Sequence, residues 1–136
     1  MIAALICAAS VAVFLQFFLV YCRSILAPSR RVALSERVRE VTGIANREVA
    51  PDDFHRLLQL VWLCPARGDD CSEIRAVGLY YGLLAVLKRV SAIAGPKVSG
   101  WVDHERSDCS YFAAVALDRR ISYSRDLFTQ QISDRL

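Results

Sequence analysis

The sequence lacks the short motifs by which catalytic and cofactor-binding sites are commonly recognised. It contains no Gly-x-x-x-x-Gly-Lys-Ser/Thr phosphate loop, no Gly-x-Ser-x-Gly nucleophile turn and no Cys-x-x-Cys pair. Each of these motifs places a reactive or phosphate-binding group at a fixed position, so its absence removes the corresponding sequence argument for an enzyme. We therefore expect a non-catalytic protein without a cofactor.

An excess of positive charge is also absent from most of the chain. The formal net charge is +3, but Arg23, Arg30 and Arg31 carry three positive charges between them. From Val32 onward, 14 basic residues face 14 acidic ones. Nucleic-acid binding requires a concentrated basic field that contacts phosphates, so we expect no nucleic-acid partner.

No charged side chain occurs in the first 22 residues, where only Ser10 and Gln16 interrupt an apolar run. A helix of about 20 apolar residues spans the roughly 30 Å hydrocarbon core of a bilayer. A cleaved signal peptide needs a basic start, a shorter apolar core and a small-residue cleavage site, and the run meets none of these conditions. We expect residues 1–22 to be a retained transmembrane signal-anchor, followed by a basic linker at 23–31 and one helical domain at 32–136.

Basic residues follow the apolar run on one side only, beginning with Arg23, Arg30 and Arg31. Basic residues near the end of a span stay in the cytoplasm, so we expect the N-terminus outside and the C-terminal domain inside. Cytoplasmic cysteines remain thiols. The alternative is an exported, membrane-tethered binding domain or lipoprotein, in which Cys64 would pair with Cys71.

Apolar residues recur with the period of an α-helix through most of the domain. The patterns and the breakers between them predict helices over residues 35–49, 51–63, 72–94, 111–117 and 124–136, with a loop at 65–70 and a turn at 95–100. The first helix could instead begin at Ser29, and residues 111–117 could instead form a short buried strand. Gly43 is a weak point at which the first of these helices is expected to break. The predicted fold class is all-α: a single N-terminal transmembrane helix followed by a compact four- to five-helix cytoplasmic bundle centred on residues 72–94.

Small residues line one face of the predicted helix 72–94. Glycine inside a helix costs roughly 1 kcal/mol relative to alanine, and small residues four apart let a second helix approach closely. We name this face the interaction stripe; it consists of Arg75, Gly78, Gly82, Ala85 and Arg89. We expect the stripe to contact a neighbouring helix or a protein partner of unknown identity, and a homo-oligomer is compatible with it.

The second alternative is a small metal- or thiol-dependent enzyme that uses the polar cluster Asp103–Cys109. Its candidate ligands are His104 and Asp108, one helical turn apart, together with Cys109. Zinc sites usually contain closely spaced pairs such as Cys-x₂-Cys or His-x₃-His, and no such pair is present, so we expect a solvated turn and no metal. The leading expectation is a non-catalytic interaction, accessory or assembly subunit of a membrane complex, with the lipid bilayer and a protein as its partners.

Overall fold

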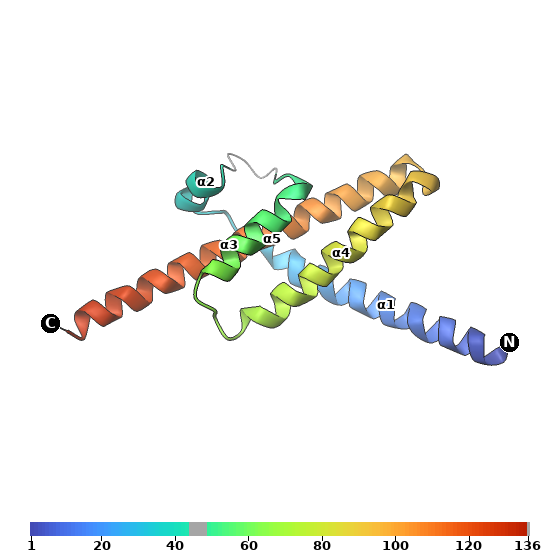
Figure 1. Cartoon of the computed structure of the whole chain (residues 1–136), viewed down its shortest axis with the longest axis horizontal. Coiled ribbons are helices and arrows are strands. Elements are labelled where there is room, and N and C mark those ends of the chain that lie inside the picture. The colour runs from blue at the N-terminus through green and yellow to red at the C-terminus, as the bar shows by residue number, and fades with distance from the viewer. Residues whose placement is uncertain (44–48, 136) are drawn as a thin grey trace.

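A computed structural model describes residues 1–43 and 49–135 of the chain. Within these ranges the chain forms five α-helices and one short 3₁₀ helix, without a strand (Figure 1). In chain order the elements are α1 (Ile2–Ser29), α2 (Glu36–Thr42), η1 (Pro51–Asp53), α3 (Phe54–Leu63), α4 (Asp70–Ala94) and α5 (Pro96–Ser133). The prediction of an all-α fold with one long apolar helix at the N-terminus is confirmed.

Local signals set the ends of the short helices. Pro51 opens the 3₁₀ turn that leads into α3, and Cys64 leaves the helix in an extended conformation immediately before Pro65. Proline suits the first turn of a helix and disfavours helical geometry in the residue before it. Gly43 closes α2 in the left-handed conformation, at φ +69°, and the rest of the helix predicted up to residue 49 lies largely outside the described residues.

The first helix is longer than the predicted span, because α1 continues through Ser29. The linker expected at 23–31 is therefore helical over most of its length. Cys22, Leu26 and Ser29 are buried against the body of the protein, and α1 contacts both α4 and α5. Tertiary packing on one face thus extends the helix through a segment that its arginines and Pro28 would otherwise mark as a linker.

The second half of the chain differs from the prediction. A single residue, Gly95 with φ +106°, separates α4 from α5, and Pro96 begins a helix of 38 residues. The turn expected at 95–100 is confined to Gly95, and the two helices predicted at 111–117 and 124–136 are parts of one continuous helix. Arg120 is fully buried, and its Nη1 donates a hydrogen bond of 2.7 Å to the carbonyl oxygen of Val61. Polar residues do not interrupt this helix because they bond to neighbouring helices.

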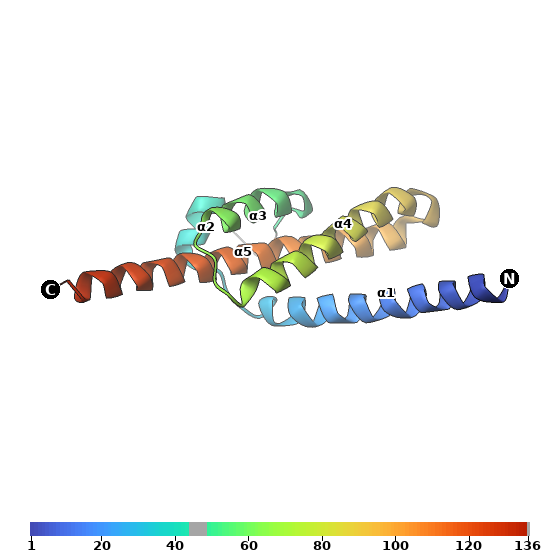
Figure 2. The same ribbon diagram turned by 60° about the horizontal axis from the view of Figure 1, so that its bottom comes forward.

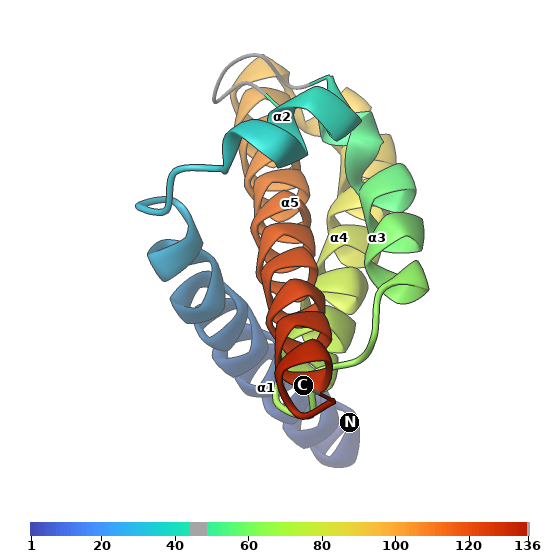
Figure 3. The same ribbon diagram turned by 90° about the vertical axis from the view of Figure 1, so that its left-hand side faces the viewer.

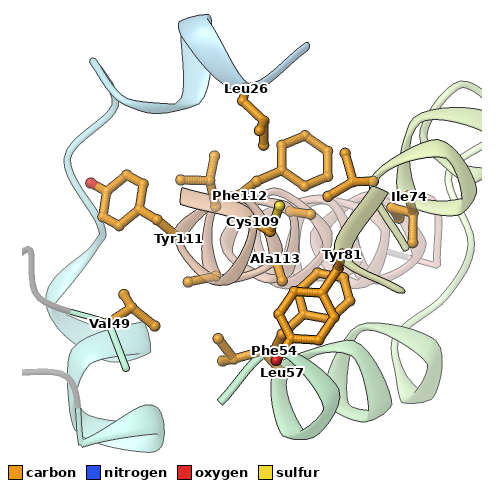
Figure 4. Packing of buried hydrophobic residues seen from close by; sticks show 14 of the residues in the cluster. Leu26, Val49, Phe54, Leu57, Ile74, Tyr81, Cys109, Tyr111, Phe112 and Ala113 are labelled. Atoms are coloured by element: carbon orange, nitrogen blue, oxygen red, sulfur yellow. The ribbon is translucent and has the colours of Figure 1, made fainter. Parts of the chain in front are cut away.

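The packing centre is α5 and not the predicted helix 72–94. α5 contacts α1, α2, η1, α3 and α4, and viewed along its axis it runs between the other helices (Figure 3). Every residue from Cys109 to Leu117 is buried. Leu26 of α1 faces Phe112 on one side of α5, and the stacked rings of Phe54 and Tyr81, 4.3 Å apart, lie on the other (Figure 4).

The two termini project from opposite ends of the molecule (Figures 1 and 2). The N-terminal part of α1 extends away from the bundle on the side of the turn between α4 and α5. The C-terminal part of α5 extends on the other side, beyond α2 and α3. Both projections carry exposed apolar side chains, such as Phe17 on α1 and Phe128 on α5.

Candidate functional site at the base of α1

α1 is the one helix among residues 1–43 and 49–135 that is long and apolar enough to cross a membrane. It has 28 residues, its most apolar 18-residue window has a mean hydropathy of 2.5, and none of that window is buried. A contiguous exposed apolar surface of this kind marks a membrane or protein contact. The junction between this helix and the body is therefore the candidate functional site.

A buried carboxylate joins α1 to the body. Nη2 of Arg23 donates a hydrogen bond of 2.9 Å to Oε1 of Glu105, and the hydroxyl of Tyr80 donates one of 2.9 Å to Oε2. The guanidinium of Arg23 also lies 5.4 Å from the centre of the Trp101 ring. A carboxylate is stable away from water only when it is paired and hydrogen-bonded. The carboxylate of Glu105 thus has its counter-charge only while α1 packs against α4 and α5.

The same environment raises the pKa values of two neighbouring groups, the hydroxyl of Tyr80 on α4 and the thiol of Cys109 on α5. Burial, followed by the hydrogen bond to Glu105 and its negative charge, raises the pKa of the Tyr80 hydroxyl above its ordinary range. Burial, followed by the charges of Glu105 and Asp108, raises the pKa of the Cys109 thiol in the same way. Because the thiolate is the nucleophile and the metal ligand, the raised pKa makes Cys109 less reactive at neutral pH than an exposed thiol.

A cavity of about 720 Å³ opens beside the base of α1. Its lining residues come from the end of α1, the segment before α3 and one face of α5: Arg30, Val49, Ala50, Pro51, His104, Ser107, Asp108 and Tyr111. Arg30 pairs with Asp108, and Nε2 of His104 lies 3.7 Å from Oδ2 of the same carboxylate. The hydroxyl of Ser107 donates to the carbonyl oxygen of Val49 at 2.8 Å. These groups bond to one another or to the backbone, so the cavity suits non-covalent contact with a polar group.

The structure places His104 and Asp108 one turn apart on α5, which is the spacing on which the metal alternative depended. It does not bring Cys109 to them, because that side chain points into the core (Figure 4). Within the described ranges, no group of three or more histidine, cysteine, aspartate or glutamate residues is arranged to hold a metal ion.

The cluster Asp103–Cys109 is not the solvated turn that we expected. It lies within α5, and its charged residues hold three other elements in place: Lys88 of α4 pairs with Asp103, Arg23 of α1 with Glu105, Asp52 of η1 with Arg106, and Arg30 after α1 with Asp108. Arg106 also donates a hydrogen bond of 2.8 Å to the hydroxyl of Tyr81. The sequence signal for this arrangement was present but weak, namely three acidic residues and one arginine within six residues.

The interaction stripe lies on the surface of α4. A Cβ atom added at Gly78 or Gly82 would have no neighbour within 4 Å outside its own helix backbone. The close approach of another helix of this chain, expected at these glycines, is therefore wrong for the described residues. Arg75 and Arg89 at the two ends are exposed. A protein partner at the stripe stays a prediction.

Comparison with known protein families, curated proteins and solved structures found no match to this chain. The functional conclusion therefore comes from the geometry of the chain itself.

Proposed function

We propose that the chain is a single-pass membrane protein anchored by α1, whose helical body acts as a non-catalytic interaction or assembly subunit of a membrane complex. The observation that carries this proposal is the pair of projecting helices. α1 extends from one end with an apolar surface along its length, and the last part of α5 extends from the opposite end (Figures 1 and 2). One end suits lipid and the other suits a protein.

The anchor is coupled firmly to the body. One face of the last turns of α1 is buried at Cys22, Leu26 and Ser29. The guanidinium of Arg23 pairs with the buried carboxylate of Glu105. A flexible tether would need none of these contacts. A rigid connection supports a role in which the body is held at a defined position relative to the bilayer.

The projecting part of α5 supplies a surface for a protein partner. Phe128 and Ile132 are 66 % and 62 % exposed, and Leu127 beside them is also exposed. Residues four apart lie on the same face of a helix, and an apolar helix face is a common means of binding in a partner's groove. We call residues 121–133 the arm.

The orientation follows from Arg23, Arg30 and Arg31, which lie at or just beyond the base of α1. Positive residues on this side favour a cytoplasmic body and an external N-terminus. Reporter fusions at the two ends test this orientation. An external C-terminus would refute it and would favour the exported alternative with a Cys64–Cys71 disulfide.

Co-purification in a mild detergent tests the proposed role. The variant Phe128→Glu with Ile132→Glu places two charges on the apolar face of the arm. Gln130→Glu with Gln131→Glu is the matched control, because it adds the same charge to exposed polar positions of the same helix. We expect membrane association in alkaline carbonate to persist in both variants and the partner to be lost from the first alone. A wild-type chain that carbonate extracts from membranes, or a partner retained by both variants, would refute the proposal.

A further inference from the structure

We propose that the tip of the α4–α5 hairpin contacts the bilayer that α1 crosses, so that the body binds lipid directly. We define the hairpin tip as residues 86–91 and 95–101. This inference rests on the proposed function, because it requires α1 to span the membrane.

The part of α1 that is free of the body is shorter than the hydrocarbon core of a bilayer. Phe18 and Leu19 are partly buried against the core, whereas every residue from Ile2 to Phe17 is exposed. Sixteen residues at 1.5 Å each give about 24 Å, and the hydrocarbon core is about 30 Å thick. Tilting the helix shortens the thickness that it covers. About one more turn of α1 must therefore lie in hydrocarbon, at a level where the body already packs against it.

The α4–α5 hairpin runs toward the end of the molecule at which the N-terminus of α1 lies. The thiol of Cys22 donates a hydrogen bond to the carbonyl oxygen of Ala76 at 3.8 Å, which places the start of α4 beside the end of the predicted span. From there α4 runs toward the same end of the molecule as the N-terminus of α1, and α5 returns from that end (Figures 1 and 2). The hairpin tip is thus the part of the body on the membrane side.

The hairpin tip and the face of α4 that leads to it carry exposed apolar and aromatic side chains. Leu79, Val86 and Val90 are 68 %, 62 % and 54 % exposed and lie on one face of α4. Trp101 is also exposed and lies beside Arg23. Tryptophan and basic residues are enriched at the membrane interface, where the ring meets the headgroups and the cation meets phosphate. This face of α4 is therefore apolar and exposed, as the surface of α1 is.

The charges of the tip match an anionic lipid surface. Residues 86–91 and 95–101 contain Lys88, Arg89 and Lys97 and no acidic residue. Lys88 pairs with Asp103, so its charge is compensated within the protein. Arg89 and Lys97 are exposed and are the two cations available to phosphates. Basic residues near an anionic membrane surface are attracted to its phosphates, which is why the occupant that we assign is lipid.

The two tryptophans of the chain provide the test. Trp101 lies in the hairpin tip and Trp62 lies on α3, and both are exposed. Trp62→Phe leaves Trp101 as the reporter, and Trp101→Phe leaves Trp62. Each full-length variant is reconstituted into phosphatidylcholine–phosphatidylglycerol vesicles whose phosphatidylcholine is brominated near the headgroup end of its acyl chains. We expect Trp101 to lose about half or more of its fluorescence relative to unbrominated vesicles, and Trp62 to lose little.

A charge-reversal pair tests the role of the cations. Arg89→Glu with Lys97→Glu is expected to reduce the quenching of Trp101. Arg119→Glu with Arg125→Glu, at exposed positions nearer the end of α5, is the matched control and is expected to leave the quenching unchanged.

The outcomes separate this inference from the proposed function. A chain that does not float with vesicles overturns the anchor itself. A chain that floats while Trp101 is quenched no more than Trp62 overturns the hairpin contact and leaves the anchor intact. Disulfide cross-linking between two copies of a Val86→Cys variant, together with an unquenched Trp101, would assign the apolar face of α4 to a second copy of this chain instead of lipid.

Discussion

The contact between Arg23 and Glu105 leads to the sharpest prediction, because it joins α1 to the body through a buried charge. The side chain of Glu105 is 4 % exposed and that of Arg23 is 51 % exposed. In Arg23→Ala the carboxylate keeps the hydrogen bond from Tyr80 but loses its counter-charge. We expect this variant to unfold at lower denaturant concentration than the wild-type chain.

The magnitude follows from the exposure of the two partners. Removing one partner of a fully buried ion pair costs about 3–5 kcal/mol, because the other charge is left uncompensated. Pairs on the surface contribute about 0–1 kcal/mol. Arg23 is half exposed, so water remains within reach of the carboxylate once the guanidinium is gone. We expect the free energy of unfolding to fall by about 2–3 kcal/mol, which lies between these limits.

A second substitution distinguishes an unpaired charge from lost packing. In Arg23→Ala with Glu105→Gln no buried charge remains, and the amide oxygen still accepts the hydrogen bond from Tyr80. We expect the double variant to be more stable than Arg23→Ala alone. Arg119→Ala removes an exposed arginine from α5 and serves as the control, with a change within about 0.5 kcal/mol.

Denaturation of the detergent-solubilised chain, followed by the fluorescence of Trp101 in a Trp62→Phe background, measures these differences. The ring of Trp101 lies beside Arg23 and responds directly when α1 separates from the body. Arg23→Ala as stable as the Arg119→Ala control would refute the reasoning. So would a double variant less stable than Arg23→Ala, because the loss would then come from packing and not from the unpaired charge.

Three further predictions concern the core and the stripe. Cys109 will resist alkylation by a maleimide in the native chain at pH 8 and react after unfolding, because burial raises the pKa of its thiol and excludes the reagent; mass spectrometry of the labelled chain checks this, and native labelling would contradict it. The free energy of unfolding will fall as the pH rises above the ordinary thiol pKa of 9.0, because the unfolded chain releases protons that Cys109 and Tyr80, with raised pKa values, retain in the folded chain; denaturant midpoints at pH 8 and pH 10 measure the change, and an equal or higher midpoint at pH 10 would contradict it. Gly82→Ala will raise the free energy of unfolding by up to about 1 kcal/mol, because alanine favours the helix and a Cβ there meets open space; a loss of stability in the same assay would mean that a neighbour packs against this position.

Helix ends set by local chemistry were predictable from the sequence. Pro51, Cys64-Pro65 and Gly43 act through the conformations open to their own backbones, so α2 and α3 begin or end close to the expected residues. Prediction failed where the deciding partner was distant along the chain. Residues 118–123 fell between two predicted helices, but the guanidinium of Arg120 lies in the core and donates a hydrogen bond to the carbonyl oxygen of Val61 in α3.

The candidate site shows the same division. The spacing of His104 and Asp108 brings the two side chains together only in a helix, where residues four apart share a face, and we had expected a turn. It did not predict that Asp108 pairs with Arg30, 78 positions away, or that Glu105 pairs with Arg23, 82 positions away. A charge on the sequence has no visible partner until the fold places one beside it.

The sequence by itself determined that the chain begins with an uncharged helix long enough to cross a bilayer and that the remainder is helical. Hydrophobic period and the absence of charge are local properties, so they need no knowledge of the fold. Only the tertiary structure decided that α5 is the centre of the bundle, that the cluster Asp103–Asp108 holds α1, η1 and α4 to it, and that the tip of the α4–α5 hairpin lies toward the same end of the molecule as the N-terminus of α1. The physical reason is that buried ion pairs and helix packing depend on which distant segments meet, and that is a property of the folded chain alone.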